Sequence, residues 1–231
     1  MFKFKQFEVK QNQSAMKVGT DAVLLGSWVK YNNPLSILDI GSGTGVISLM
    51  MAQRFNKSDI TAIEIDKEAF IECNINFKNS KWNNRLNCIH DALQTYKFSQ
   101  KFDLIISNPP YFKSTTPSKS ESRKIARHEN CLKMEELLFY SSKLLKSDGI
   151  IAIIIPYERF LDIKTYIIQE NLFLKRICKI KGNKKAHIKR IMLEISKNEN
   201  ETISEQLIIE EDRHQYTKEY KRLCKEFYLN F

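Results

Sequence analysis

Three of the chain's seven glycines fall within five positions, at Gly41, Gly43 and Gly45. They follow an apolar run, 35–40, and precede a second apolar stretch, so the pattern predicts a strand, a glycine loop and a helix. Glycines let the backbone pass close to a ligand because no Cβ stands in the way. Val46 occupies the position of the third glycine in the dinucleotide fingerprint, which disfavours pyrophosphate binding. The chain is therefore predicted to build a strand that ends in a ligand-binding loop.

Carboxylates end the next two predicted strands. Glu64 lies 19 residues after Gly45, at the tip of the second strand. A carboxylate at that place accepts both hydroxyls of a ribose, so Glu64 is a candidate nucleoside ligand, and an ordinary surface acid is the alternative. Asp66 is predicted to cap the helix that follows. Asp91 ends the third strand, 86–92, and is a candidate acceptor for the amino group of an adenine.

A predicted buried strand, 104–107, ends in Asn108, Pro109, Pro110 and Tyr111. Each proline pushes the residue before it towards an extended conformation, so the strand tip is stiff. The Asn108 side-chain oxygen and the Pro109 carbonyl can each accept one N–H of a planar exocyclic amine, while the Tyr111 ring stacks on the base. Two rigid acceptors also favour the pyramidal geometry that this nitrogen needs for attack. A simple Asn-Pro turn is the alternative.

Strands and helices alternate along the rest of the chain. The expected elements are a hairpin 2–18, a helix with Thr20 as N-cap, strand 35–40, helix 46–55, strand 60–66, helix 67–79, strand 86–92, strand 102–107, helix 134–145 ended by Asp148-Gly149, strand 150–155, helix 159–170, strands 173–181 and 188–196, strand 207–209 and a charged helix ending at Phe231. The short link 181–183 predicts an antiparallel pair. The fold class is therefore α/β, a doubly wound Rossmann-like sheet, mostly parallel with an antiparallel C-terminal hairpin.

The charge of the chain favours a polyanionic partner. Lysine and arginine number 37 against 27 acidic residues, and eight of these cations with no acid lie in 175–190. A solvated face is the alternative interpretation of that run. The stretch 112–131 is either a clamp for a polyanion backbone or a disordered loop. The candidate contacts are Lys113, Arg123, Lys124, Lys184, Lys185, Lys189 and Arg190.

Composition predicts a cytoplasmic protein without a metal site. The five cysteines are odd in number and scattered, with no Cys-x-x-Cys, which is typical of free thiols in a reducing compartment. No run of 18 apolar residues predicts a membrane span. The first residues lack the apolar core of a signal peptide.

On a doubly wound sheet, the order of glycine loop, acid, Asp91 and the Asn-Pro-Pro-Tyr tip resembles the class I S-adenosylmethionine-dependent methyltransferases that act on amino nitrogens. More closely, the chain is similar to the tRNA (adenine-N6)-methyltransferase family, which modifies adenosine 37 beside the anticodon of a valine tRNA. Beyond the tetrapeptide, the resemblance rests on 16–21 with 24–28, 126–129, 216–220 and 227–229. It spans nearly the whole chain.

The resemblance implies S-adenosylmethionine as cofactor and S-adenosylhomocysteine as product. The residues implied to bind the cofactor are Thr20, Asp21, Asp39, Gly41, Gly43, Gly45, Glu64, Asp91, Ala92 and Asn108. The residues implied to be catalytic are Asn108, Pro109, Pro110 and Tyr111. A single domain, 1–231, is expected, with 1–33 covering the cofactor or packing on the sheet edge and 34–231 forming the catalytic core.

The implied reaction is direct, in-line methyl transfer that needs no metal and no covalent enzyme intermediate. The chain is expected to act as a monomer that holds the anticodon stem-loop of tRNA with its basic residues. A base in stacked RNA cannot enter such a pocket, so the target adenosine is expected to be splayed out of its loop.

Other proteins share the Asn-Pro-Pro-Tyr tip. A glutamine methyltransferase of release factors normally has a helical domain before the glycine loop, and only 40 residues precede Gly41. An rRNA guanine-N2 methyltransferase more often has Phe where Tyr111 stands, and a DNA adenine methyltransferase needs a separate target-reading domain. A catalytically silent RNA-binding relative would have no need of Asn108 and Glu64.

Overall fold

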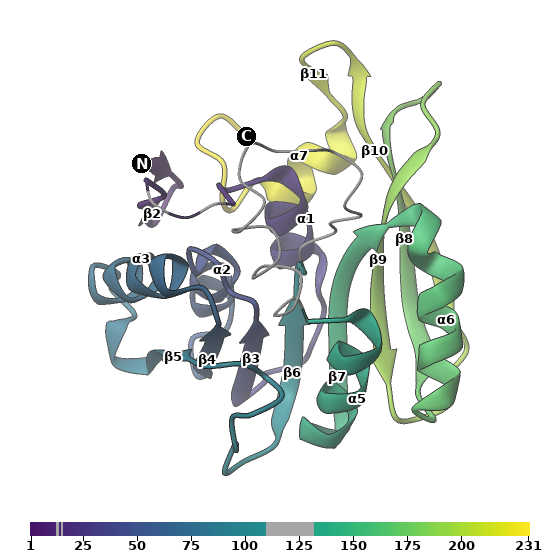
Figure 1. Cartoon of the computed structure of the whole chain (residues 1–231). Helices are drawn as coiled ribbons and strands as arrows, with labels where there is room; N and C mark the ends of the chain where they lie inside the picture. The colour runs from purple at the N-terminus through teal and green to yellow at the C-terminus, as the bar shows by residue number, and fades with distance from the viewer. Residues whose placement is uncertain (13, 15, 110–131) are drawn as a thin grey trace, which may run out of the picture.

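The computed structural model describes residues 1–12, 14, 16–109 and 132–231, which build one large sheet flanked by helices (Figure 1). The strands of this sheet, from one edge to the other, are β11 (Gln215–Tyr216), β10 (Ile203–Asp212), β8 (Phe173–Asn183), β9 (Ile188–Ser196), β7 (Leu145–Pro156), β6 (Phe102–Ser107), β3 (Ser36–Ile40), β4 (Asp59–Glu64) and β5 (Leu86–His90). The helices are α1 (Thr20–Trp28), α2 (Val46–Arg54), α3 (Lys67–Lys78), α5 (Met134–Leu144), α6 (Phe160–Gln169) and α7 (Lys218–Cys224).

The sheet is mostly parallel. Strand β9 runs antiparallel to both β7 and β8, and β11 runs antiparallel to β10, while the other neighbours are parallel. Because β9 reverses direction between two neighbours, β8 and β10 point the same way as β6. The carboxyl ends of β3, β4, β6, β7, β8 and β10 therefore lie along one edge, which is where open α/β sheets bind ligands.

A continuous apolar run explains why strand β7 is buried on both faces. In β7, Ile150 and Ile154 belong to one core, and Ile151 and Ile155 belong to the core on the opposite face. Successive side chains of a strand point to opposite faces, so a continuous apolar run fills both layers. Helices α1, α2, α3 and α7 pack in the first layer, and α5 and α6 pack in the second.

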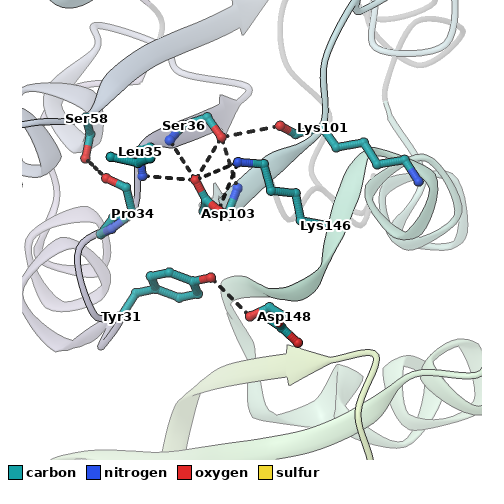
Figure 2. Close-up of polar contacts among 9 residues, drawn as sticks. All are labelled: Tyr31, Pro34, Leu35, Ser36, Ser58, Lys101, Asp103, Lys146 and Asp148. Atoms are coloured by element: carbon teal, nitrogen blue, oxygen red, sulfur yellow. Dashed lines mark hydrogen bonds and ion pairs between the residues drawn. The ribbon is translucent and has the colours of Figure 1, made fainter.

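The amino ends of β3, β6 and β7 are joined by the carboxylate of Asp103 (Figure 2). Its Oδ2 accepts the backbone N–H groups of Leu35 and Ser36, each at 2.9 Å. Lys146 Nζ lies 3.0 Å from both carboxylate oxygens. Burial alone would raise the pKa of Asp103, but the hydrogen bonds from Lys146 and Ser36 outweigh it and lower the pKa. This edge of the sheet is therefore fixed by a well-matched charge.

The N-terminal segment packs on α3 and on the C-terminal tail. A small hairpin pairs β1 (Phe2–Lys3) with β2 (Glu8–Val9). Lys5 donates its backbone N–H to the carbonyl of Phe227 at 2.9 Å, which brings the two ends of the chain together (Figure 1). Beyond the hairpin, the backbone N–H of Ser14 donates to Glu72 of α3 at 2.9 Å.

The structure confirms the predicted order of strands and helices apart from β11, which was not predicted, and it confirms the antiparallel pair β8–β9; the N-terminal hairpin is shorter than the predicted 2–18 and ends at Val9. Asp66 caps α3 as predicted, accepting the backbone N–H of Ala69 at 2.9 Å. The prediction of an N-cap at Thr20 is wrong, because Gly19 takes that position and Thr20 is already helical. Helix α5 ends at Leu144 rather than at Asp148-Gly149. Strand β7 therefore starts earlier than predicted, because it pairs with β6 from Leu145 onwards.

The C-terminal region differs most from the prediction. Strand β10 covers Ile203–Asp212 rather than 207–209, because it pairs in parallel with β8 from Ile203↔Arg176 to Glu210↔Asn183. The last helix is shorter than predicted and ends at Cys224. Four cysteines among the described residues are buried free thiols, as expected.

Candidate active site

The glycine loop connects β3 to α2 with three residues in the left-handed region. Gly41, Gly43 and Gly45 have φ of 68°, 55° and 79°, a conformation that other residues adopt only with strain. A Cβ on Gly45 would lie 2.6 Å from the ring of Phe77, so this position also needs glycine for packing. A Cβ on Gly41 or Gly43 would meet no atom within 4 Å. The loop therefore offers open backbone on which the polar part of a ligand can lie.

Asp39 lies beneath this loop and is fully buried. Its Oδ2 accepts the backbone N–H of Ser48 at 3.1 Å and the Ser48 hydroxyl at 2.7 Å. Burial raises the pKa of Asp39 to about 7, although the bonds from Ser48 oppose the shift and the nearby charge of Glu64 adds to it. The observed contacts of Asp39 tie β3 to the first turn of α2, so it fixes the position of the loop.

Glu64, at the carboxyl end of β4, lies directly beside the glycine loop. Its Oε2 accepts the backbone N–H of Gly43 at 2.7 Å, and its Oε1 accepts the N–H of Asp66 at 2.9 Å. Burial raises the pKa of Glu64, and these two backbone bonds limit the shift. The chain thus positions a carboxylate next to the open backbone of the loop, as a nucleoside ligand requires.

Asp91 and Ala92 follow β5, the strand beyond β4. The Asp91 Oδ1 accepts the backbone N–H of Ala92 and the hydroxyl of Thr95, both at 2.7 Å. Since β5 pairs with β4 through Glu64↔His90, Asp91 comes one residue after the level of Glu64. Glycine loop, Glu64 and Asp91 therefore follow one another along the same edge of the sheet.

Asn108 follows β6, which pairs with β3 on the side opposite to β4. The register Ile40↔Ser107 brings the residues after these strands, Gly41 and Asn108, to the same level. Ser107 reinforces this pairing, because its hydroxyl donates to the carbonyl of Ile40 at 2.8 Å. Asn108 is half-buried and Pro109 is buried. Pro110 and Tyr111, the other two predicted catalytic residues, lie outside the described residues.

Thr20 and Asp21 are the first two residues of α1, and they lie near β8 and β9. Asp21 Oδ2 forms an ion pair of 2.8 Å with Arg190 of β9. Together with Lys189, these residues line a cavity of about 690 Å³ between α1, the β8–β9 hairpin and the C-terminal tail. Within the described structure, Asp21 therefore contacts the β9 side of the sheet.

The predicted basic cluster divides into two parts. Lys184 and Lys185 are exposed at the β8–β9 turn and Lys189 is exposed at the start of β9, whereas Arg176 of the same run is buried. Arg176 is 4% exposed, lies 3.2 Å from Glu194 of β9 and donates to the carbonyl of Trp28, so its guanidinium is held inside the protein and is not available to RNA. The candidates Lys113, Arg123 and Lys124 lie outside the described residues.

Sequence reasoning missed the buried side chain of Asn76 on α3. Its amide donates to the carbonyls of Lys10 at 3.0 Å and Thr44 at 2.9 Å, and its oxygen accepts the N–H of Lys10 at 2.8 Å. Asn76 therefore holds the N-terminal segment against the glycine loop. The available signal was Glu72 four residues earlier, since two polar residues at this spacing share one helix face.

Comparison with known proteins identifies the class to which this site belongs. Residues 12–184 match the family model described as Methyltransferase small domain. A predicted O-methyltransferase from Agrobacterium tumefaciens has a TM-score of 0.71 at 18% identity, covering 90% of this chain and 96% of that one. A methyltransferase subunit of a type I restriction-modification system from Streptococcus thermophilus has a TM-score of 0.63 at 15% identity, covering 92% of this chain and 52% of that one. The protein has the fold of an S-adenosylmethionine-dependent methyltransferase and is an enzyme of that class.

More similar relatives narrow the class to one family. Proteins from Flavobacterium psychrophilum and Flavobacterium johnsoniae, both named tRNA1(Val) (adenine(37)-N6)-methyltransferase, are 44% and 45% identical to this chain. In each case the match covers 99% of both sequences. The chain belongs to this family. The expected fold class, S-adenosylmethionine as cofactor and the resemblance stated from the sequence are confirmed.

Proposed function

We propose that this protein transfers a methyl group from S-adenosylmethionine to N6 of an adenosine in tRNA, namely adenosine 37 beside the anticodon of tRNA1(Val). The observation that carries the proposal is full-length similarity to relatives with that name, at 44–45% identity. The pairing of β3 with β6 supports it, because it aligns Asn108 with the first glycine of the cofactor loop. The glutamine and guanine-N2 alternatives have no comparable support.

The residues at the carboxyl edge suit the cofactor. The open backbone of Gly41 and Gly43 would hold its amino acid part, and the carboxylate of Glu64 would accept the ribose hydroxyls. Asp91 and Ala92 would contact the adenine ring. The bound cofactor supplies an electrophilic methyl group on a sulfonium.

Asn108 and Pro109 would orient the target nitrogen. The lone pair of an adenine amino group is delocalised into the ring, so the group is planar and a poor nucleophile. Two fixed oxygen acceptors, one from each residue, bind its two N–H groups and favour a pyramidal nitrogen. They also hold that nitrogen in one place, which removes the entropic cost of finding the reactive geometry. Tyr111 is proposed to stack on the base.

The basic residues of the β8–β9 turn, with those of 113–127, are the proposed contacts of the tRNA. Lys184, Lys185 and Lys189 are exposed, as contacts to phosphates require. We propose that the enzyme acts as a monomer in the cytoplasm, where tRNA is modified. None of the described helices is long and apolar enough to cross a membrane.

Product identification tests the function. Purified protein and labelled S-adenosylmethionine are incubated with an unmodified tRNA1(Val) transcript and with the same transcript carrying guanosine at position 37. After digestion, label is expected in N6-methyladenosine from the first transcript only. Release factor and rRNA are tested as alternative substrates in separate reactions. Label on glutamine or in N2-methylguanosine would contradict the proposal.

A further inference from the structure

The cavity of about 690 Å³ lies apart from the glycine loop and has a wall of aromatic rings. The rings of Tyr216 and Phe231 are 5.2 Å apart, and those of Tyr228 and Phe231 are 5.0 Å apart. Tyr220 lies beneath them, almost fully buried, with its ring centre 5.3 Å from Tyr216. Tyr216, Tyr228 and Phe231 are half-buried, so part of each ring faces the cavity or solvent. Such rings are stacking surfaces for a nucleobase.

Cations line the same cavity. Lys189 is exposed, Arg190 is half-buried next to it in the sequence, and Lys3 is exposed in an ion pair of 3.2 Å with Glu8. Two acidic side chains lie on the described wall: Asp21 is matched by Arg190 at 2.8 Å, and Glu210 lies on β10. Exposed lysines beside aromatic rings are the combination with which proteins hold single-stranded nucleic acid, since the rings bind bases and the cations bind phosphates.

The cavity and Asn108 lie along the same edge of the sheet. Arg190 is paired with Pro156, at the carboxyl end of β7, and Glu210 with Asn183, at the carboxyl end of β8. Three strand intervals separate β6 from β8 and four separate β6 from β10. With about 4.8 Å between strands, the cavity is roughly 14–19 Å from Asn108 along this edge. At about 3.4 Å per stacked nucleotide, roughly four to six nucleotides span that distance.

We propose that this cavity binds a second, unpaired nucleotide of the RNA substrate, a few positions away from the adenosine that reacts at Asn108. The proposal rests on the proposed function, because it takes tRNA as the bound RNA. Its base stacks on Tyr216 and its phosphates contact Lys189. The cavity thus contributes to binding and to the choice of RNA, and takes no part in the methyl transfer.

Two variants test the cavity. Tyr216→Leu removes the ring with little loss of volume, and it is expected to weaken tRNA binding at least about fivefold. Tyr216→Phe keeps the ring and is its matched control, expected to bind within about twofold of the wild type. Lys189→Ala should reduce the slope of log Kd against log salt by about 0.7–0.9. Lys164→Ala, an exposed lysine on α6, is the control for charge and should leave that slope unchanged.

Three measurements are made on each variant: tRNA binding by filter retention, S-adenosylmethionine binding by calorimetry, and ultraviolet crosslinking to tRNA with peptide mapping. The proposal predicts weaker tRNA binding for Tyr216→Leu, unchanged cofactor affinity, and a crosslink in 216–231. Equal tRNA affinity of Tyr216→Leu and Tyr216→Phe would overturn it. So would a loss of cofactor affinity without a loss of tRNA affinity, since the cavity would then bind a small ligand.

These readouts separate the cavity from the proposed function, because neither binding nor crosslinking needs methyl transfer. If tRNA binding depends on the Tyr216 ring but no N6-methyladenosine forms, the cavity is supported and the proposed function fails. If N6-methyladenosine forms at the same KM for tRNA in Tyr216→Leu as in the wild type, the cavity proposal fails and the function stands.

Discussion

The carboxylates at the two edges of the central sheet have pKa values that are shifted in opposite directions. At the amino edge, Asp103 accepts bonds from two backbone N–H groups and lies 3.0 Å from Lys146, and its pKa is lowered (Figure 2). Towards the carboxyl edge, burial raises the pKa of Asp39 to about 7 and also raises the pKa of Glu64. The charge of Asp103 is matched by Lys146, whereas Asp39 and Glu64 accept hydrogen bonds from backbone N–H groups and from the Ser48 hydroxyl.

This difference separates stability from ligand binding. A carboxylate whose pKa is lowered in the folded state stabilises the fold, and one whose pKa is raised destabilises it when charged. The amino edge thus joins three strands at a low energetic cost. The carboxyl edge retains buried carboxylates that carry a cost, which is expected where a ligand or a loop must be positioned.

Substitution of Asn108 should have the largest effect. Asn108→Ala removes one of the two acceptors proposed for the target amine, so kcat should fall by about 10²–10³. S-adenosylmethionine affinity should stay within about twofold, measured by calorimetry alongside single-turnover rates. Asn87→Ala, an exposed asparagine on β5, is the matched control and should change neither quantity. A collapse of cofactor binding in Asn108→Ala would instead assign Asn108 to the cofactor pocket.

Asp103→Asn should show the largest loss of stability at the amino edge. At pH 7 the free energy of unfolding is expected to fall by about 2–3 kcal/mol, since a charged partner of Lys146 is lost. Because the folded pKa of Asp103 is lowered, its stabilisation is present above the unfolded pKa and is lost as pH falls through the folded value. The difference in unfolding free energy between wild type and variant, measured with urea, should therefore shrink as pH falls below about 4.

The matched control is Asp162→Asn on α6, which removes an exposed ion pair with Arg159, the residue before that helix. It should change the free energy of unfolding by less than about 0.5 kcal/mol at either pH. An Asp103→Asn variant as stable as this control at pH 7 would contradict the role given to the amino edge.

Asp39→Asn should show the opposite dependence on pH. Because the folded pKa of Asp39 is raised from 3.8 to about 7, its stabilisation is present below the unfolded pKa and is lost as pH rises through about 7. The variant lacks this loss. The difference in unfolding free energy, variant minus wild type, should therefore increase by roughly 2 kcal/mol between pH 5 and pH 8. A difference that does not change with pH would show that Asp39 does not titrate in this range.

Glu64→Gln should have the smallest effect of the set, on cofactor affinity. An amide accepts a ribose hydroxyl more weakly than a carboxylate does, so the Kd for S-adenosylmethionine should rise about tenfold. Calorimetry at pH 8 measures it, with Glu68→Gln, an exposed residue on α3, as the control. Unchanged affinity in Glu64→Gln would remove Glu64 from the cofactor site.

Much of the fold was predictable because local patterns determine it. The apolar run of β7, the glycines before α2 and the Asp66 cap each act within a few residues. The predicted strand β10 was too short, because the sequence alone does not show that its first residues pair with β8. Arg176 falls in the basic run 175–190, for which the sequence leaves a solvated face and a polyanion contact open, and the register Arg176↔Glu194 shows that its partner lies within the protein.

The site was predictable to about the same extent as the fold. Glycine loop, Glu64 and Asn108 each end a strand, and parallel strands bring their carboxyl ends together. The role of Asn76 and the aromatic cavity depend on contacts between segments far apart in the sequence. Phe231, for example, lies beside Tyr216 only because the tail turns back after α7.

The most direct test is a crystal structure of the protein with S-adenosylhomocysteine. The account predicts the ribose hydroxyls on the carboxylate of Glu64, the amino acid part on the backbone of Gly41 and Gly43, and the sulfur facing the side chain of Asn108. A ligand bound instead in the cavity beside Tyr216, or an Asn108 side chain directed away from the sulfur, would contradict it.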